Sequence, residues 1–90
     1  METVLALFKM AMGITHALRD AYFTQMLEAR QAELAERGVV LDLDKTVDQI
    51  LLVDYTEWCY RKRTEDAPLA QNLQWRIRNR QVKGRAASGT

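Results

Sequence analysis

The sequence predicts a small all-α domain of about four helices, with a long central helix and a basic C-terminal helix. Three observations support this fold class. Apolar residues recur at intervals of three and four along most of the chain. Isolated glycines, Gly13, Gly38 and Gly84, separate the periodic stretches. Val39–Leu43 is the one short β-branched run, and no second run stands ready to pair with it.

Length and composition point to one domain. The chain has 90 residues, 48% of them hydrophobic and 28% charged, which is ordinary for a globular protein. We expect a single helical domain over residues 1–83 and a flexible tail over 84–90. A chain of this size buries a modest core, so self-association or a partner would stabilise it.

The first helix is expected over Glu2–Met12, where Leu5, Phe8 and Met12 follow helical spacing and Gly13 ends it. The second, the long central helix, is expected from His16 to Arg37, with Thr15 as its N-cap and Gly38 as its end. Two apolar rows fit this helix: Leu18, Tyr22, Met26 and Ala29, and Phe23, Leu27 and Leu34.

Val39–Leu43 is interpreted as a connector, and Asp44 or Thr46 as the cap of a third helix that runs to about Lys62. Val47, Ile50, Leu51, Tyr55 and Trp58 form a wide apolar stripe on it, and further apolar residues flank the stripe. So apolar a helix is enclosed by neighbours or faces a second subunit. We expect subunit contacts at Leu52, Tyr55, Trp58 and Tyr60.

After a turn at Thr64–Ala67, Pro68 suits the first position of a last helix, which Gly84 would end. Its segment Trp75–Arg85 contains five cations and no acid. A helix this short and positive is unstable alone, so it needs the body of the protein or an acidic partner. The candidate partner-binding residues are Trp75, Arg76, Arg78, Arg80, Lys83 and Arg85.

The charge is distributed unevenly along the chain. Residues 1–60 contain five Lys and Arg against ten Asp and Glu, and residues 61–90 contain eight against two. This pattern suits packing against copies of the same chain, or a basic face that meets an acidic partner.

No residue pattern predicts catalysis, a cofactor or a metal site. His16, the one histidine, has no ligand-type residue at metal spacing, and we expect it at the surface. Cys59 is expected to be a buried structural cysteine in a reducing compartment. Asp54 is expected to pair with Arg61 or Arg76, and the alternative is a catalytic carboxylate. No apolar run is long enough to predict a membrane span.

Three interpretations of the basic segment compete. It is a solvated helix face, a clamp for nucleic-acid phosphates in a small helical DNA-binding regulator, or a protein-docking element. The net negative charge of residues 1–60 disfavours a duplex. Arginine with tryptophan is the composition of interface hot spots, which favours protein docking.

Two stretches resemble a known family. The first stretch is Leu7–Thr15, followed by Asp20 and Tyr22–Leu27. The second is Leu52–Tyr55 through Trp58, Tyr60, Arg61 and Arg63, followed by Pro68, Leu73 and Trp75–Arg80. Both are similar to the small head–tail connector (adaptor) proteins of long-tailed bacteriophages. The resemblance covers roughly residues 5–83. Met12 stands where leucine is commoner before the glycine.

The resemblance implies an all-α, non-enzymatic virion protein, made in the host cytoplasm and placed in the neck between capsid and tail. It implies a homo-oligomeric ring, generally a dodecamer, under the portal protein, with the next neck or tail-completion protein below. DNA would pass through the ring without sequence-specific binding. The C-terminal helix, with Arg76, Arg78, Arg80, Lys83 and Arg85, would contact the portal.

Overall fold

The computed structural model of the chain describes residues 1–62 and 70–88, with only the helical backbone described for 83–88. Four helices make up this described part: α1 (Glu2–Met12), α2 (Asp20–Glu36), α3 (Thr46–Lys62) and α4 (Gln71–Ser88). It contains no strand. The predicted fold class, a small all-α bundle, is confirmed.

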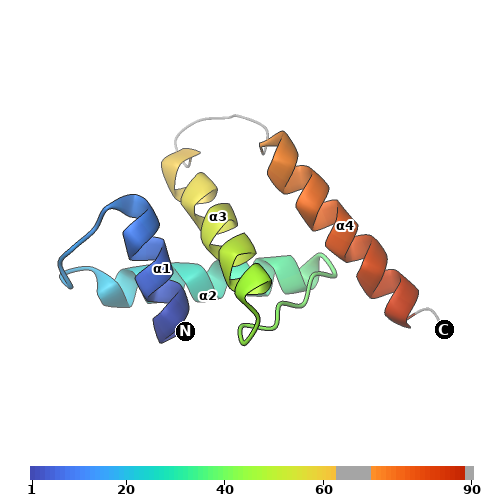
Figure 1. Cartoon of the computed structure of the whole chain (residues 1–90), viewed down its shortest axis with the longest axis horizontal. Coiled ribbons are helices and arrows are strands. Elements are labelled where there is room, and N and C mark those ends of the chain that lie inside the picture. The colour runs from blue at the N-terminus through green and yellow to red at the C-terminus, as the bar shows by residue number, and fades with distance from the viewer. Residues whose placement is uncertain (63–69, 89–90) are drawn as a thin grey trace.

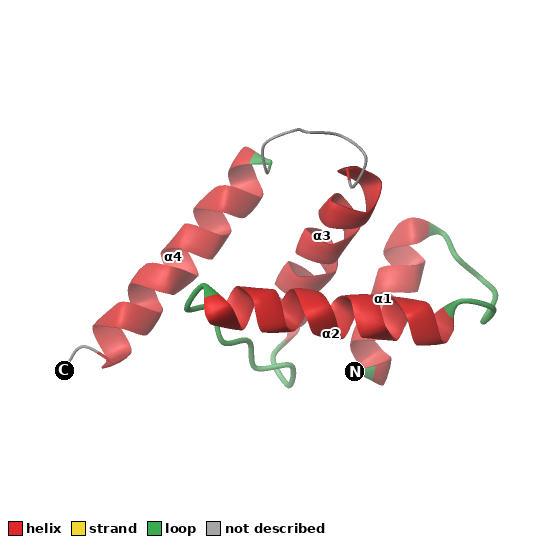
Figure 2. Ribbon diagram, turned by 180° about the vertical axis from the view of Figure 1, so that it is seen from behind, coloured by secondary structure: helices red, strands yellow, loops and turns green. Residues whose placement is uncertain are grey.

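The first three helices form the body of the molecule. α1 and α3 lie side by side, and α2 crosses behind both (Figures 1 and 2). Their shared core contains an aromatic cluster in which the Phe8 ring lies 5.4 Å from Phe23 and 6.4 Å from Tyr60. α4 runs down the other side of α3 (Figure 1), so α3 is the helix that joins α4 to the body.

Two of the predicted helix ends are confirmed. Gly13 and Gly38 follow α1 and α2 with φ values of 72° and 87°, the left-handed conformation that glycine adopts without steric cost. The Gly13 amide donates to the carbonyl oxygen of Met10, and the Gly38 amide donates to that of Ala35. The chain therefore turns where the glycines predicted it would.

The predicted start of the second helix is wrong. α2 begins at Asp20, not at His16, and Thr15 does not cap it. The ammonium of Lys9 lies 2.8 Å from the carboxylate of Asp20, and the Arg19 guanidinium lies 5.0 Å from the centre of the Tyr22 ring. The first contact joins the start of α2 to α1 and the second lies within the first turn of α2, and the residues before them form an irregular loop.

The two apolar rows predicted for the second helix differ in burial. Phe23, Leu27 and Leu34 are buried, as one of the rows predicts. The other row is not a buried face, because Leu18 lies outside the helix and Tyr22 and Ala29 are exposed.

α3 is buried over a different arc from the predicted stripe. Leu51, Leu52 and Tyr55 are buried, but Val47 and Ile50 are exposed. The predicted connector before α3 is confirmed as irregular backbone, and it anchors itself by burying Val39 and Leu41. The Gln49 side-chain amide also donates to the Leu43 carbonyl oxygen, at 2.7 Å.

The last helix ends later than predicted. α4 continues through Gly84 to Ser88, so Gly84 does not end it and residues 84–88 are helical. One glycine inside a helix lowers its stability but does not break it when the residues on both sides favour the helix. The turn predicted at Thr64–Ala67 and Pro68 itself lie outside the described residues. The predicted helix start is nevertheless too early, because Ala70 is not helical and α4 begins at Gln71.

Candidate docking surface on the last helix

α4 packs on the body through one face, the inner face, formed by Leu73, Arg76, Ile77 and Arg80. Leu73 and Ile77 are buried, at 4% and 5% exposure. Arg76 donates to the Asp54 carboxylate at 2.9 Å, and Arg80 donates with two nitrogens to the Asp48 carboxylate. Two apolar side chains and two ion pairs therefore hold α4 against α3.

Asp48 is the centre of this attachment. It is 2% exposed, and besides Arg80 it accepts a hydrogen bond from the backbone amide of Asp42 at 2.7 Å. The Arg80 guanidinium lowers the pKa of Asp48 despite the opposing effect of burial, and Asp48 in turn raises the pKa of Arg80. The carboxylate thus joins three segments: the connector, α3 and α4.

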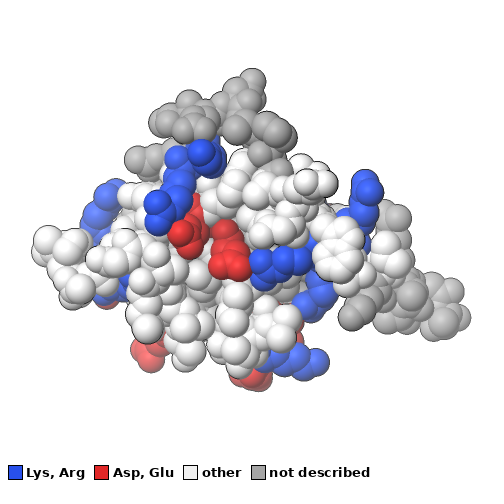
Figure 3. Space-filling model, turned by 45° about the horizontal axis from the view of Figure 1, so that its top comes forward, with Lys and Arg blue, Asp and Glu red and all other residues white. Residues whose placement is uncertain are grey.

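The prediction for Asp54 is confirmed in one of its two forms. Its partner is Arg76 and not Arg61, which binds Glu57 one turn away at 3.0 Å. On the face turned forward in Figure 3, acidic and basic side chains lie in contact with one another. These ion pairs neutralise part of the positive charge of α4 within the chain.

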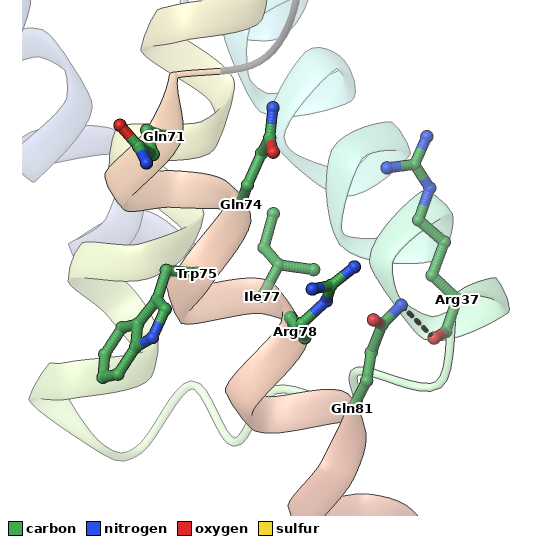
Figure 4. Close-up of a pocket in the computed structure, with 7 residues that line it drawn as sticks. All are labelled: Arg37, Gln71, Gln74, Trp75, Ile77, Arg78 and Gln81. Atoms are coloured by element: carbon green, nitrogen blue, oxygen red, sulfur yellow. Dashed lines mark hydrogen bonds between the residues drawn. The ribbon is translucent and has the colours of Figure 1, made fainter.

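The opposite side of α4 is uncovered by the described residues. We call it the outer face of α4: Gln71, Trp75, Arg78 and Val82, spaced i, i+4, i+7 and i+11 on one side of the helix. Trp75 is 68% exposed and Val82 58%, and Arg78 is exposed between them. In Figure 4 the Trp75 indole points away from Arg37, on the other side of α4.

A shallow groove lies between α4 and the end of α2. The Gln81 side-chain amide donates to the Arg37 carbonyl oxygen at 2.8 Å and closes its lower end (Figure 4). Arg78 and Gln74 line it and Ile77 lies at its base. The groove borders the outer face of α4 and adds Arg37, Gln74 and Gln81 to the polar surface beside it.

The six predicted partner-binding residues therefore divide into three groups. Arg76 and Arg80 belong to the inner face and are engaged within the chain. Trp75 and Arg78 lie on the outer face and are exposed. Lys83 and Arg85 lie on the last turns of α4, and their side chains are outside the described residues.

The predicted subunit contacts on α3 need correction. Leu52 is fully buried and Tyr55 is 3% exposed, so neither lies on the surface of the chain. The Tyr55 hydroxyl donates to Glu33, and burial together with this bond raises the pKa of Tyr55. Trp58 and Tyr60 are half-buried. Leu52 and Tyr55 are therefore covered by the helices of their own chain, while Val47 and Ile50 remain exposed.

Sequence reasoning missed the Asp48–Arg80 pair. From the sequence, Asp48 is an acid in the first turn of the third helix, where the helix dipole favours a negative charge. A signal was present, because Asp48, Leu52 and Tyr55 have the i, i+4, i+7 spacing of one helix face, and that face is buried. An acid on a buried face needs a cation from another element, and the last helix contained several.

The residues considered for chemistry lie apart from one another. His16 is exposed and its Nδ1 accepts a hydrogen bond from the Leu18 amide, at 3.4 Å. Cys59 is a free cysteine and is half-buried, not buried as predicted. Within residues 1–62 and 70–88 no three His, Cys, Asp or Glu side chains are grouped as metal ligands. None of the helices in this part of the chain has the length and apolar character of a membrane span.

Comparison of the chain with protein-family models, with curated proteins and with solved structures gave no match.

Proposed function

We propose that this protein is a structural head–tail connector subunit, which assembles into a ring, docks on a portal and joins a capsid vertex to the tail. It would act in the neck of the virion, with DNA passing through the ring, and without catalysis. The observation that carries the proposal is the outer face of α4. A helix fixed by one face leaves a tryptophan, an arginine and a valine in solvent on the other.

Such a face suits a protein partner. The inner-face contacts hold α4 in place before binding, so little conformational freedom is lost on docking. Tryptophan and arginine are the residues that dominate interface energetics when they become buried. Because α4 contains no acid, an acidic partner surface complements it.

The ion pairs of the inner face weigh against the alternative of a DNA-binding regulator. Arg76 and Arg80 are engaged by Asp54 and Asp48, so their charge is partly neutralised before a phosphate arrives. The remaining exposed cation of the described part of α4 is Arg78. Fewer free cations mean fewer released counterions and weaker duplex binding.

The structure changes which residues we assign to the portal. Arg76 and Arg80 hold α4 in place, so reversing their charges would detach the helix and would not report on docking alone. Lys83 and Arg85, on the last turns of α4, are the better candidates for portal contacts.

The test uses the full chain. Light scattering and negative-stain electron microscopy are expected to show a ring, and added purified portal rings of a long-tailed bacteriophage should carry it on one end. Lys83→Glu with Arg85→Glu should abolish portal attachment, whereas the control Lys45→Glu should not. A chain that stays monomeric at all concentrations, or that binds duplex DNA with a steep salt dependence, would contradict the proposal.

A further inference from the structure

The outer face of α4 carries bulky apolar side chains on both sides of a cation. Trp75 and Val82 are separated by seven residues, and Arg78 lies between them. Two α4 helices are poor partners for each other, because an antiparallel pair would place one Arg78 against the other. A surface that fits this face has short side chains, which bulky side chains can cover, and an acid to pair with the cation.

α2 presents a surface of that kind. Most residues on its exposed side are short or acidic, and with Gln25 we call them the outer face of α2: Gln25, Glu28, Ala29, Ala32, Ala35 and Glu36. Tyr22, in the first turn of the helix, is also exposed. Ala29, Ala32 and Ala35 leave a low surface that a large side chain can cover. Glu28 is exposed among them, while Glu33 on the other side of the helix is held by Arg30 and Arg37.

We propose that the outer face of α4 of one copy docks on the outer face of α2 of a second copy, with Arg78 paired to Glu28 and Trp75 seated over the alanines. The inference rests on the proposed ring, and it names the contact that builds it. Bulky side chains meet small ones, and the cation meets an acid. Contacts to the portal then fall to the last turns of α4, with Lys83 and Arg85.

The spacing favours antiparallel helices. Trp75 precedes Arg78 by three residues, and Ala32 follows Glu28 by four. With Arg78 opposite Glu28, helices of opposite direction place Trp75 over Ala29 and Ala32. Helices of the same direction would place Trp75 against the longer Gln25.

The contact uses different surfaces on the two copies, so it is heterologous. Each copy offers one face of α4 and one face of α2, and such contacts close into a ring when the rotation per subunit allows it. A single helix pair buries less than the roughly 1,200 Å² of a stable interface. Each contact is therefore weak alone, and ring closure stabilises the assembly.

Charge exchange tests the pairing in the full chain, with mass measured by light scattering across a concentration series. Arg78→Glu and Glu28→Arg should each weaken self-association about tenfold or more, because like charges then face each other. The double variant should recover most of the wild-type association. Lys45→Glu, just before α3, and Glu2→Arg on α1 make the same charge changes at exposed sites off these faces and should associate as wild type.

Cross-linking tests the register. In a Cys59→Ser background, a mixture of Trp75→Cys chains and Ala32→Cys chains should form a covalent dimer on oxidation, and a chain carrying both changes should form a ladder. A disulfide forms only when the two Cα atoms lie about 4.4–6.8 Å apart.

The outcomes separate this inference from the proposed function. A wild-type chain that is monomeric overturns both. A wild-type ring whose Arg78→Glu and Glu28→Arg variants assemble normally, or are not rescued when combined, overturns the α4–α2 contact alone. Loss of portal attachment with normal assembly in the Arg78→Glu variant would assign the outer face of α4 to the portal and also overturn it.

Discussion

At the scale of single residues, the ion pair of Asp48 and Arg80 decides how α4 is held. Arg80→Leu would leave the 2% exposed Asp48 carboxylate with one backbone donor and no cation. We expect a loss of about 3 kcal/mol in the free energy of unfolding, measured by urea denaturation.

Arg78→Leu is the matched control for this substitution. It changes the same residue type on the exposed side of the same helix, and we expect an effect within about 0.5 kcal/mol. Asp48→Asn added to Arg80→Leu should recover part of the loss, because no charge then remains buried. Equal stability of the Arg80→Leu and Arg78→Leu variants would contradict the assigned role of the pair.

The same carboxylate predicts a pH dependence. Its pKa in the folded chain lies below the ordinary value of 3.8. The unfolded chain therefore binds the proton first as the pH falls, and the stabilisation present above pH 3.8 is lost as the pH drops through the folded pKa. Unfolding free energies measured between about pH 6 and about pH 2 should fall less steeply for Asp48→Asn than for wild type. Parallel curves would exclude Asp48 as a source of acid sensitivity.

The residue-level predictions from sequence succeeded where a charge had few candidate partners. Asp54 has Arg61 seven residues further along the same side of α3 and Arg76 on the next helix, and its partner is Arg76. The partner of Asp48 depends on how far α4 is rotated about its axis and where it crosses α3. Only tertiary packing sets these quantities, so local spacing did not reveal the pair.

At the scale of elements, the helix ends set by backbone geometry were predictable and those set by tertiary contacts were not. Gly13 and Gly38 end their helices because their left-handed φ is costly for other residues. The start of α2 depends on Lys9, which reaches Asp20 from α1. A capping signal at Thr15 could not compete with contacts that lie far away in sequence.

Gly84 and Gly38 should respond in opposite directions to substitution by alanine. Gly84 lies inside α4, so alanine should stabilise that helix by about 0.5–1 kcal/mol and slow hydrogen exchange of its amides. At Gly38 the added Cβ would meet no atom within 4 Å, but φ is 87°, so backbone strain should cost about 1 kcal/mol. Faster exchange in α4 of Gly84→Ala would show that the helix needs the glycine.

At the scale of the whole molecule, the fold class was predictable from helical periodicity, but the assignment of surfaces was not. The many apolar residues of α3 predicted a subunit interface, but the buried ones pack against α1, α2 and α4 of the same chain. Counting apolar residues on one helix does not reveal how many neighbours it has. The surfaces that we propose for contact with other molecules are the outer faces of α4 and α2. The sequence indicated Trp75 and Arg78 on the first of them, but nothing in it indicated Glu28 and the alanines on the second.

The unequal charge of the two parts of the chain predicts that assembly depends on salt. Residues 1–60 carry five more acids than bases, residues 61–90 carry six more bases than acids, and the proposed contact joins one part to the other through exposed Arg78 and Glu28. Raising NaCl from about 50 mM to about 500 mM shortens the screening length several-fold, so the dissociation constant of self-association should rise about tenfold. Sedimentation velocity over that range measures it, and a variant with Arg78→Gln and Glu28→Gln should associate more weakly at low salt but respond less to added salt. Association that strengthens with salt would mean that apolar burial alone drives assembly and that the charge pattern does not direct it.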